Sequence, residues 1–357
     1  MEDKKEITAE NIETPHKRRP RYKGTHPRKF SEKYKELNPE KYADTVEKII
    51  KKGNTPAGMH ISIMVNEILE FLDIKEGQIG LDATLGYGGH SLEMLKKLNH
   101  TGHLYGLDID PIESEKTKIR LENKGFGADD MTVILTNFKN IDKVAAEHGP
   151  FDFIMADLGV SSMQIDDPER GFSFKHEGPL DLRLDPTHGI TAAERLKQVK
   201  YDELLGMLIE NSDEPYAEQI AREIFYRRNH HIPIETTKDL YDVVDKALGF
   251  IPEKDHKYAV KKSCQRTFQA LRIDINQEFE VLYQFLEKLP SALKSGGRAA
   301  ILTFHSGEDR LVKKSFKQLQ KDGVYSDVAR NVICPSDEEC RQNSRATSTK
   351  MRWAIKA

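Results

Sequence analysis

Two short segments of the sequence combine glycines with acidic side chains at a spacing that suits the binding of a nucleoside. Residues 81–90 read LDATLGYGGH and bring Gly86, Gly88 and Gly89 together, and a turn without Cβ atoms can approach a ligand closely. Asp108 follows 22 residues after Gly86 (108 − 86), where a carboxylate can accept hydrogen bonds from both ribose hydroxyls. The glycine-rich turn alone is equally compatible with a structural turn, so it is the pair that indicates a nucleotide site.

The type of nucleotide follows from the residues around this turn. The dinucleotide fingerprint G-x-G-x-x-G requires glycine at position 91, which is Ser91 here, and the sequence has no phosphate-binding G-x-x-x-x-G-K-[ST] loop. S-adenosylmethionine carries ribose and adenine but no phosphate. It therefore suits a site made of a glycine-rich turn and an acidic residue better than NAD does. Phe138 follows the third predicted strand and can pack on the adenine, although a role as a core aromatic is an equal alternative.

A third acidic position, Asp157, ends the apolar run at residues 151–157 and is our candidate catalytic group. The exocyclic amine of a nucleobase is a poor nucleophile because its lone pair is delocalised into the ring. A carboxylate that accepts the N–H bonds of this amine can align the nitrogen with a methyl group. The alternative role of Asp157 is structural, as a cap for the following turn. Such a transfer needs no metal, and the sequence has no H-x-x-x-H or C-x-x-C ligand pair.

The strands that precede these residues must position them. The pattern of apolar and helical segments along the chain predicts an α/β fold with a parallel sheet. Short apolar runs alternate with helical patterns from residue 78 onward. Ligands bind such sheets at the carboxyl ends of the strands, where Asp108 and Asp157 fall. The predicted strands are 79–83, 103–108, 132–135, 151–157, 298–304 and 351–356, and the predicted core helices include 91–98, 112–123 and 309–320.

The alternation stops after Asp157, and helical patterns follow at 201–210, 216–228 and 237–248. We therefore predict a nucleotide-binding core of residues 56–165 and 263–357, interrupted by a helical insertion at 166–262. Residues 1–55 are predicted to form a basic, disordered extension, because positions 15–35 hold nine Lys or Arg residues against one Glu. An arm of this charge favours salt-sensitive binding to nucleic acid, and a merely solvated tail is the alternative.

The composition excludes several classes of protein. The 357 residues contain no apolar run of eighteen, which excludes a membrane span, and the start MEDKKEITAE lacks the apolar region of a secretory signal. Three cysteines, Cys264, Cys334 and Cys340, are too few for a disulfide framework in a chain of this length. We expect a cytoplasmic protein whose partner is a large polyanion.

The ordered motifs of this chain closely resemble those of the bacterial small-subunit (16S) ribosomal RNA cytosine-N4 methyltransferases of the MraW (RsmH) family. Matches this long and in this order are highly specific. The segments that carry the resemblance are HISIMVNE at 60–67, GYGGHS at 86–91, DLGVSSMQIDD at 157–167, ERGFSF at 169–174, GPLDLR at 178–183, RTFQALRI at 266–273, SGGR at 295–298 and FHSGEDR at 304–310.

The resemblance implies a class I S-adenosylmethionine-dependent methyltransferase fold, Rossmann-like with a seven-stranded sheet, in which the helical insertion helps to recognise RNA. It implies a target cytidine in the decoding region of 16S rRNA, with the small ribosomal subunit as partner and no metal. His90 and Gln164 enter as cofactor contacts through the resemblance alone. Carried over position by position, the cofactor-binding residues are Gly88, Gly89, His90, Asp108, Phe138, Asp157 and Gln164.

The chain also departs from the family pattern. Gly307 stands where the family usually has Leu, and Ser344-Arg345-Ala346-Thr347 stands for a Pro-Arg-Ala-Arg motif. With the long basic extension, these departures suggest a divergent branch or a second copy with a shifted RNA target. The alternatives from other classes are a non-catalytic ribosome-assembly factor and a methyltransferase for DNA or a small molecule. Three arginines, Arg170, Arg183 and Arg272, are candidate phosphate contacts, although surface arginines are more commonly salt-bridged.

Overall fold

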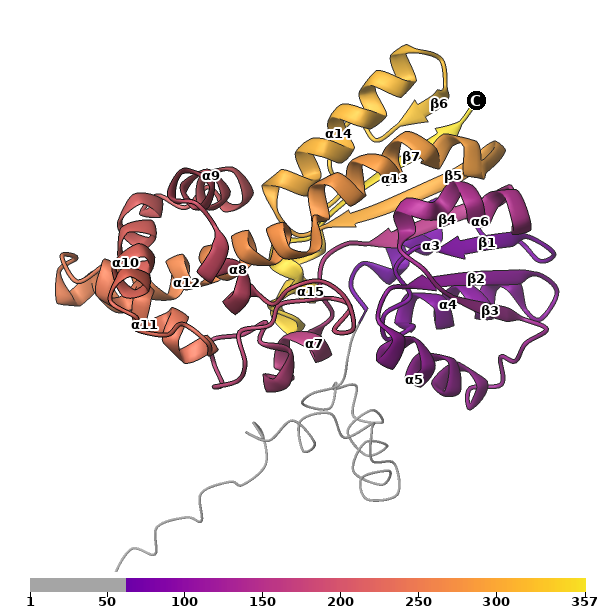
Figure 1. Cartoon of the computed structure of the whole chain (residues 1–357). Coiled ribbons are helices and arrows are strands. Elements are labelled where there is room, and N and C mark those ends of the chain that lie inside the picture. Colours follow the sequence, from indigo (N-terminus) through magenta and orange to yellow (C-terminus); the bar gives the residue numbers. More distant parts are fainter. Residues whose placement is uncertain (1–61) are drawn as a thin grey trace, which may run out of the picture. The chain divides into compact units, whose positions relative to one another are not determined.

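A single seven-stranded sheet organises the chain, and the computed structural model describes it within residues 62–357 (Figure 1). The basic extension predicted for residues 1–55 lies outside the described part. The first five strands of the sheet are parallel, and β7 runs antiparallel to both of its neighbours. The strands, in spatial order, are β3 (Met131–Leu135), β2 (His103–Asp108), β1 (Ile79–Asp82), β4 (Phe151–Asp157), β5 (Leu293–Thr303), β7 (Lys350–Lys356) and β6 (Tyr325–Val328).

This strand order confirms the predicted α/β fold with a seven-stranded sheet and identifies the edge at which sheets of this topology bind ligands. The chain builds β1, β2 and β3 outward and then returns to place β4 on the other side of β1. Such a switch point leaves a crevice at the carboxyl ends of the strands on either side. Asp82, Asp108 and Asp157 are the last residues of β1, β2 and β4, so three carboxylates meet at this edge.

Helices cover both faces of the sheet because the parallel strands are apolar on both faces. In β4, Phe153 and Met155 face one apolar cluster, whereas Phe151 and Ile154 face the other. The first cluster is closed by α3 (Val65–Leu72), α4 (Gly89–Leu98) and α5 (Pro111–Glu122), and the second by α6 (Ile141–His148), α13 (Glu278–Ala292) and α14 (Ser306–Lys321).

The segment after β4 forms a helical insertion with a hydrophobic core of its own. Its last helix, α12, runs from Glu253 to Asn276, so the predicted border at 262 falls inside a continuous helix. Cys264 and Phe268 lie beyond that border yet pack in the insertion's core, and Gln277 separates α12 from α13 with a left-handed φ of 51°. The helices before α12 are α7 (Ser162–Asp166), α8 (Ala192–Gln198), α9 (Tyr201–Ser212), α10 (Ala217–Asn229) and α11 (Thr237–Ala247).

Two further expectations can be compared with the described residues. All three cysteines are free, and Cys264 is buried whereas Cys334 is exposed. Between positions 62 and 357, no helix has both the length and the apolar character needed to cross a membrane. A short helix, α15 (Asp337–Gln342), lies between β6 and β7 and carries Cys340.

One buried ion pair ties the sheet's ligand-binding edge to the segment that leads into the insertion. Asp110 caps α5 by accepting hydrogen bonds from backbone N–H groups of its first turn through Oδ1. Its Oδ2 accepts a 2.6 Å hydrogen bond from Nη1 of Arg170, whose Nη2 donates to the carbonyl oxygens of Arg183 and Leu184. The side chains of Asp110 and Arg170 are 0% and 12% exposed, so each depends on the other for its neutralisation.

We predict that Asp110→Ala lowers the free energy of unfolding by about 3–5 kcal/mol, because it leaves the Arg170 guanidinium buried without its counter-charge and removes the cap of α5. Urea denaturation followed by circular dichroism measures this loss. The matched control is Asp129→Ala at an exposed position, which we expect to change stability by less than about 0.5 kcal/mol. Equal losses in the two variants would contradict a structural role for the pair.

Candidate active site

A cleft of about 590 Å³ opens at the carboxyl ends of the strands, at the switch point between β1 and β4. It is bordered by the turn after β1, by the ends of β2 and β4, and by the last turn of α12. All seven residues proposed from the sequence as cofactor contacts line this cleft: Gly88, Gly89, His90, Asp108, Phe138, Asp157 and Gln164. The structure thus gathers in one place residues that lie up to 76 positions apart (164 − 88).

The glycines of the turn are required by its backbone and by its neighbours. Gly86 and Gly88 have φ values of 46° and 78°, in the left-handed region that favours glycine. A Cβ at Gly88 would lie 2.6 Å from Cγ2 of Thr117, and one at Gly89 would lie 1.9 Å from Oγ of Ser62. The turn therefore packs closely against α5 and the segment before α3 while its backbone borders the cleft.

Asp108 is fixed by the backbone on both sides of the crevice. Its Oδ2 accepts a 2.8 Å hydrogen bond from the N–H of Gly86, and its Oδ1 accepts one of 2.8 Å from the N–H of Asp110. Burial raises the pKa of Asp108 to about 6, against the lowering effect of these N–H groups. The carboxylate is thus positioned at the cleft with lone pairs left for a ligand's hydroxyls.

Phe138 and Gln164 each combine a structural role with a place on the cleft wall. The Phe138 ring packs edge-to-face on Phe285, with 5.2 Å between ring centroids. Gln164 forms a capping box with Ser161 at the start of α7, and its Nε2 lies 3.3 Å from Oδ2 of Asp110. The two roles considered for Phe138 are therefore compatible with each other.

Asp157 has the least satisfied carboxyl group at the edge of the sheet. Its Oδ1 is buried and has no hydrogen-bond partner within residues 62–357. The side chain is 28% exposed, so its accessible part lies toward Oδ2, which is 3.6 Å from Nδ1 of His90. Burial raises the pKa of Asp157 to about 6; His90 opposes this shift, whereas Asp82 and Glu308 add to it. An accessible carboxylate with a raised pKa is suited to accept a proton.

Glu308 of α14 and Arg272 of α12 also line the cleft, and His305 contacts Glu308. Glu308 accepts the N–H of Phe304 at 2.8 Å and lies 3.2 Å from Nε2 of His305. Burial raises its pKa, but His305, this N–H and Arg272 outweigh burial, so the pKa lies below its usual value. Sequence reasoning assigned no role to Glu308, although an acid shortly after β5 repeats the placement of Asp157.

The residues Glu278, His305 and Glu308 bring potential metal-ligand atoms within 4.8 Å of one another. However, Arg272 donates to both carboxylate oxygens of Glu278, at 2.8 and 2.9 Å, and so supplies the positive charge that a cation would bring. We therefore derive no metal centre from this cluster.

The three candidate phosphate-binding arginines are all engaged with carboxylates. Arg170 pairs with Asp110, and Arg272 pairs with Glu278. Arg183 binds Asp181 through two hydrogen bonds, of 2.7 and 2.8 Å. These arginines therefore shape the cleft wall and the loop beside it, rather than offering free guanidinium groups.

The two departures from the family pattern have local explanations. A Cβ at Gly307 would lie 2.6 Å from the ring of Phe279, so this phenylalanine occupies space that a larger residue at 307 would need. In the 344–347 segment, Arg345 is kept, pairs with Asp166 at 3.0 Å and lines the cleft. The hydroxyl of Thr347 donates to the carbonyl of Ser344, which stabilises the turn.

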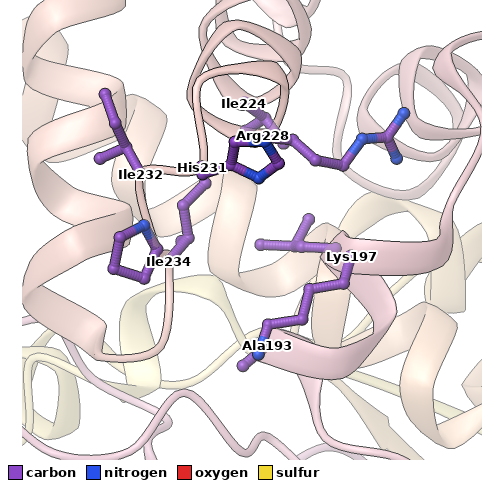
Figure 2. Close-up of a pocket in the computed structure, with 9 residues that line it drawn as sticks. Ala193, Lys197, Ile224, Arg228, His231, Ile232 and Ile234 are labelled. Carbon is purple, nitrogen blue, oxygen red and sulfur yellow. The ribbon is translucent and has the colours of Figure 1, made fainter.

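A second cavity, of about 280 Å³, lies within the insertion (Figure 2). Its two cationic side chains are already engaged, because Arg228 donates to a backbone carbonyl and Lys197 pairs with Glu235. It has no carboxylate on its wall among the described residues, so it is not the candidate for acid–base chemistry. Its lining residues are Ala193, Leu196, Lys197, Ile224, Arg228, His231, Ile232, Pro233 and Ile234.

Comparison with known proteins gives matches over nearly the whole chain. A relative in Lachnoclostridium phytofermentans, named Ribosomal RNA small subunit methyltransferase H 1, is 67% identical and covers 98% of this chain and 95% of its own. One of the same name in Agathobacter rectalis is 65% identical over 97% of this chain and 99% of its own. A relative in Clostridium botulinum, Ribosomal RNA small subunit methyltransferase H, is 37% identical over 82% of this chain and 97% of its own.

The model of the MraW methylase family matches residues 57–357, which include every strand of the sheet and every residue of the cleft. Family, fold and site agree with one another, and together they confirm the resemblance found in the sequence motifs. This protein therefore belongs to the MraW methylase family and is an S-adenosylmethionine-dependent methyltransferase.

Proposed function

We propose that this protein transfers a methyl group from S-adenosylmethionine to the N4 amine of a cytidine in the decoding region of 16S rRNA, in the cytoplasm. The observation that carries this proposal is Asp157, a partly exposed carboxyl with a raised pKa at the end of β4. The names of the relatives, which specify small-subunit ribosomal RNA, supply the substrate class. The methylated position and the subunit as partner are parts of this proposal.

The cofactor fits the end of the cleft formed by β1 and β2. Asp108, held by two backbone N–H groups, accepts the ribose hydroxyls, and Phe138 borders the adenine. The turn Gly86–Gly88–Gly89 lets the chain pass close to the amino-acid portion. No cation or phosphate-binding group is required at this end, which agrees with the charge of the ligand.

The transfer step takes place beside Asp157. The cofactor, when bound, supplies an electrophilic methyl group on a sulfonium. Asp157 accepts an N–H of the cytidine amine and so directs the nitrogen lone pair toward that methyl. As the N–C bond forms and the S–C bond breaks, the nitrogen sheds a proton, and Oδ2 of Asp157 is placed to take it. The pKa of about 6 suits a base that is ionised at neutral pH.

We further propose that the insertion recognises the RNA, with the first half of α12 as a contact surface. Lys257, Lys261 and Lys262 are exposed there, and Tyr258, which is 68% exposed, lies under Lys262 with 5.9 Å from Nζ to the ring centroid. Lysines bind phosphates, and an exposed aromatic ring can stack on a base. Lys261 precedes Arg272 on the cleft wall by eleven residues (272 − 261), or about 16 Å along the helix.

One observation favours a distinct branch of the family for this chain. The relatives numbered H 1 cover 97–98% of the chain, so their similarity extends into the residues before position 57, where the family model begins. The Clostridium botulinum relative without a number covers 82%. A second gene copy with its own RNA target is therefore the alternative function. A non-catalytic assembly factor is disfavoured, because both Asp108 and Asp157 are kept at the cleft.

We predict that Asp157→Ala abolishes most methyl transfer even at saturating cofactor. The protein would be incubated with methyl-labelled S-adenosylmethionine and small subunits from a strain lacking this gene, and label would be mapped by nuclease digestion and mass spectrometry. We expect label on a cytidine N4 with the wild type and a rate on the order of 10²–10⁴ lower with the variant. Label on another nucleotide would support the second-copy alternative, and cofactor binding without any transfer would support the assembly factor.

We predict that cofactor affinity falls below pH 6, because protonation of Asp108 removes its negative charge and so weakens its hydrogen bonds from the ribose hydroxyls. The dissociation constant should rise by up to roughly tenfold per pH unit below this value and stay constant above it. Isothermal titration calorimetry from pH 5 to 8 measures this. Asp108→Asn should bind the cofactor weakly at every pH, without the rise in dissociation constant below pH 6. Asp157→Asn should still show that rise. A rise that persists in Asp108→Asn and is lost in Asp157→Asn would contradict the ribose role of Asp108.

We predict that the double variant Lys257→Glu/Lys261→Glu weakens RNA binding and lowers the slope of log affinity against log salt by about 2, one unit for each lost phosphate contact. Filter binding to small-subunit RNA over a series of salt concentrations measures the slope. The control is Lys313→Glu/Lys317→Glu on exposed positions of α14, with the same change in charge. If the control reduces binding as much, the effect is one of net charge and α12 is not the contact surface.

A further inference from the structure

The His90 ring is held in one orientation at the cleft by a contact with the backbone. His90 lies in the first turn of α4 and is 7% exposed. Its Nε2 lies 2.9 Å from the carbonyl oxygen of Ile63. A carbonyl oxygen can only accept a hydrogen bond, so Nε2 carries a proton and donates it. The neutral ring therefore has its lone pair on Nδ1.

That lone pair lies close to the proposed catalytic carboxyl, although beyond hydrogen-bond distance. Nδ1 of His90 lies 3.6 Å from Oδ2 of Asp157. When Asp157 is ionised and His90 is neutral, two acceptors face each other, and the contact becomes favourable when one proton is present between them. The other oxygen, Oδ1, has no hydrogen-bond partner within the described part of the chain, so Oδ2 is where this pair can hold a proton.

The remaining charged groups around the pair are acidic. Asp82 lies at the end of β1, where it accepts a 2.6 Å hydrogen bond from the hydroxyl of Ser91 on α4. Glu308 on α14 is paired with His305 and lies near Arg272. Both carboxyl groups disfavour a negative charge on Asp157, whereas a protonated His90 favours it. Of the groups that act on Asp157, His90 is thus the one that can take up a proton and compensate its charge.

We propose that His90 is a positioning residue that completes the proton path of methyl transfer. This inference rests on the proposed transfer to a cytidine amine. As the N4–methyl bond forms and the sulfur–methyl bond breaks, one N4 proton passes to Oδ2 of Asp157 and is shared with Nδ1 of His90. The Nε2–H bond to Ile63 keeps the ring in place throughout. The pair returns the proton to solvent after the product leaves, so nothing is consumed besides the methyl donor.

The consequence is a rate that depends on the protonation of the pair as a unit. Below the pH at which the pair gains its first proton, it cannot accept another from the amine, and transfer slows. Above that pH the pair carries no shared proton, and the rate of transfer reaches a plateau. Without His90 the carboxylate loses the base that shares its proton, so the pH below which the rate declines should move to a lower value and the plateau rate should fall.

The test compares two substitutions at His90 that separate anchoring from proton uptake. His90→Gln can keep an N–H donor directed at the Ile63 carbonyl, and His90→Asn can keep an N–H donor near Asp157, but neither amide takes up a proton. Single-turnover methylation of small subunits at saturating cofactor would be measured from pH 5 to 9, together with the cofactor dissociation constant. Because cofactor is saturating, a change in its affinity does not enter the rate, and we expect the rate at pH 7 to fall at least about tenfold in both variants.

The control is His100→Gln, the same substitution at a histidine just beyond α4 whose side chain is 56% exposed; it should leave rate, affinity and pH profile unchanged. A wild-type rate and acid limb in His90→Gln would overturn the proposal, because anchoring to Ile63 would then be the whole role of the ring. If His90→Gln fails to fold, the same comparison with His90→Asn decides the question.

A readout that does not require activity separates this inference from the proposed function. Nitrogen-15 NMR of the histidines should show the proton of His90 on Nε2 in the neutral ring, and Asp157→Asn should shift the Nδ1 resonance of His90 but not that of His100. If wild-type protein methylates nothing while this coupling is present, the proposed function fails and the proton-sharing pair stands. If methylation occurs and the proton is found on Nδ1, the proposed path is wrong.

Discussion

The structure depends on how it keeps several carboxyl groups together at one edge of a parallel sheet. Burying a carboxylate is costly unless hydrogen bonds or opposite charges compensate it. Asp82 is satisfied by Ser91, Asp108 by two backbone N–H groups, and Glu308 by His305 and Arg272. Asp157 retains a buried oxygen without a partner among the described residues, and its basicity follows from that deficit. The proposed catalytic group is thus the carboxyl of this edge that the fold leaves incompletely paired.

The same compensation connects the core to the insertion. Asp110 caps α5 and neutralises Arg170, which in turn holds the loop through two backbone carbonyls. Helix α12 carries exposed lysines at its start and Arg272 at the cleft wall near its end. One helix therefore links the proposed RNA surface to the proposed reaction site, and we propose that RNA bound along α12 presents a base to the cleft.

Sequence patterns predicted the strands that end in the candidate site residues. They missed elements that are defined by contacts between distant parts of the chain. The strands at 103–108 and 151–157 were predicted with their observed bounds, because their apolar runs are short and end in an acid. The four-residue β6, with its two middle residues exposed, offered no such run. The border at 262 was placed inside α12 because the composition changes there while the helix continues. His90 and Gln164 were found through the family resemblance alone, and the partners of Arg170 and Arg345, 60 and 179 residues away, carry no local signal.

Asp157 is the group that we propose to accept an N–H of the amine of the target base. The most direct measurement is a crystal structure of the protein with S-adenosylhomocysteine and a cytidine bound in the cleft. We predict that N4 of the cytidine lies about 3 Å from Oδ2 of Asp157, on the side of the carboxyl that faces His90. A cytidine bound with its amine beyond hydrogen-bond reach of Asp157, and directed at another residue of the cleft, would contradict it.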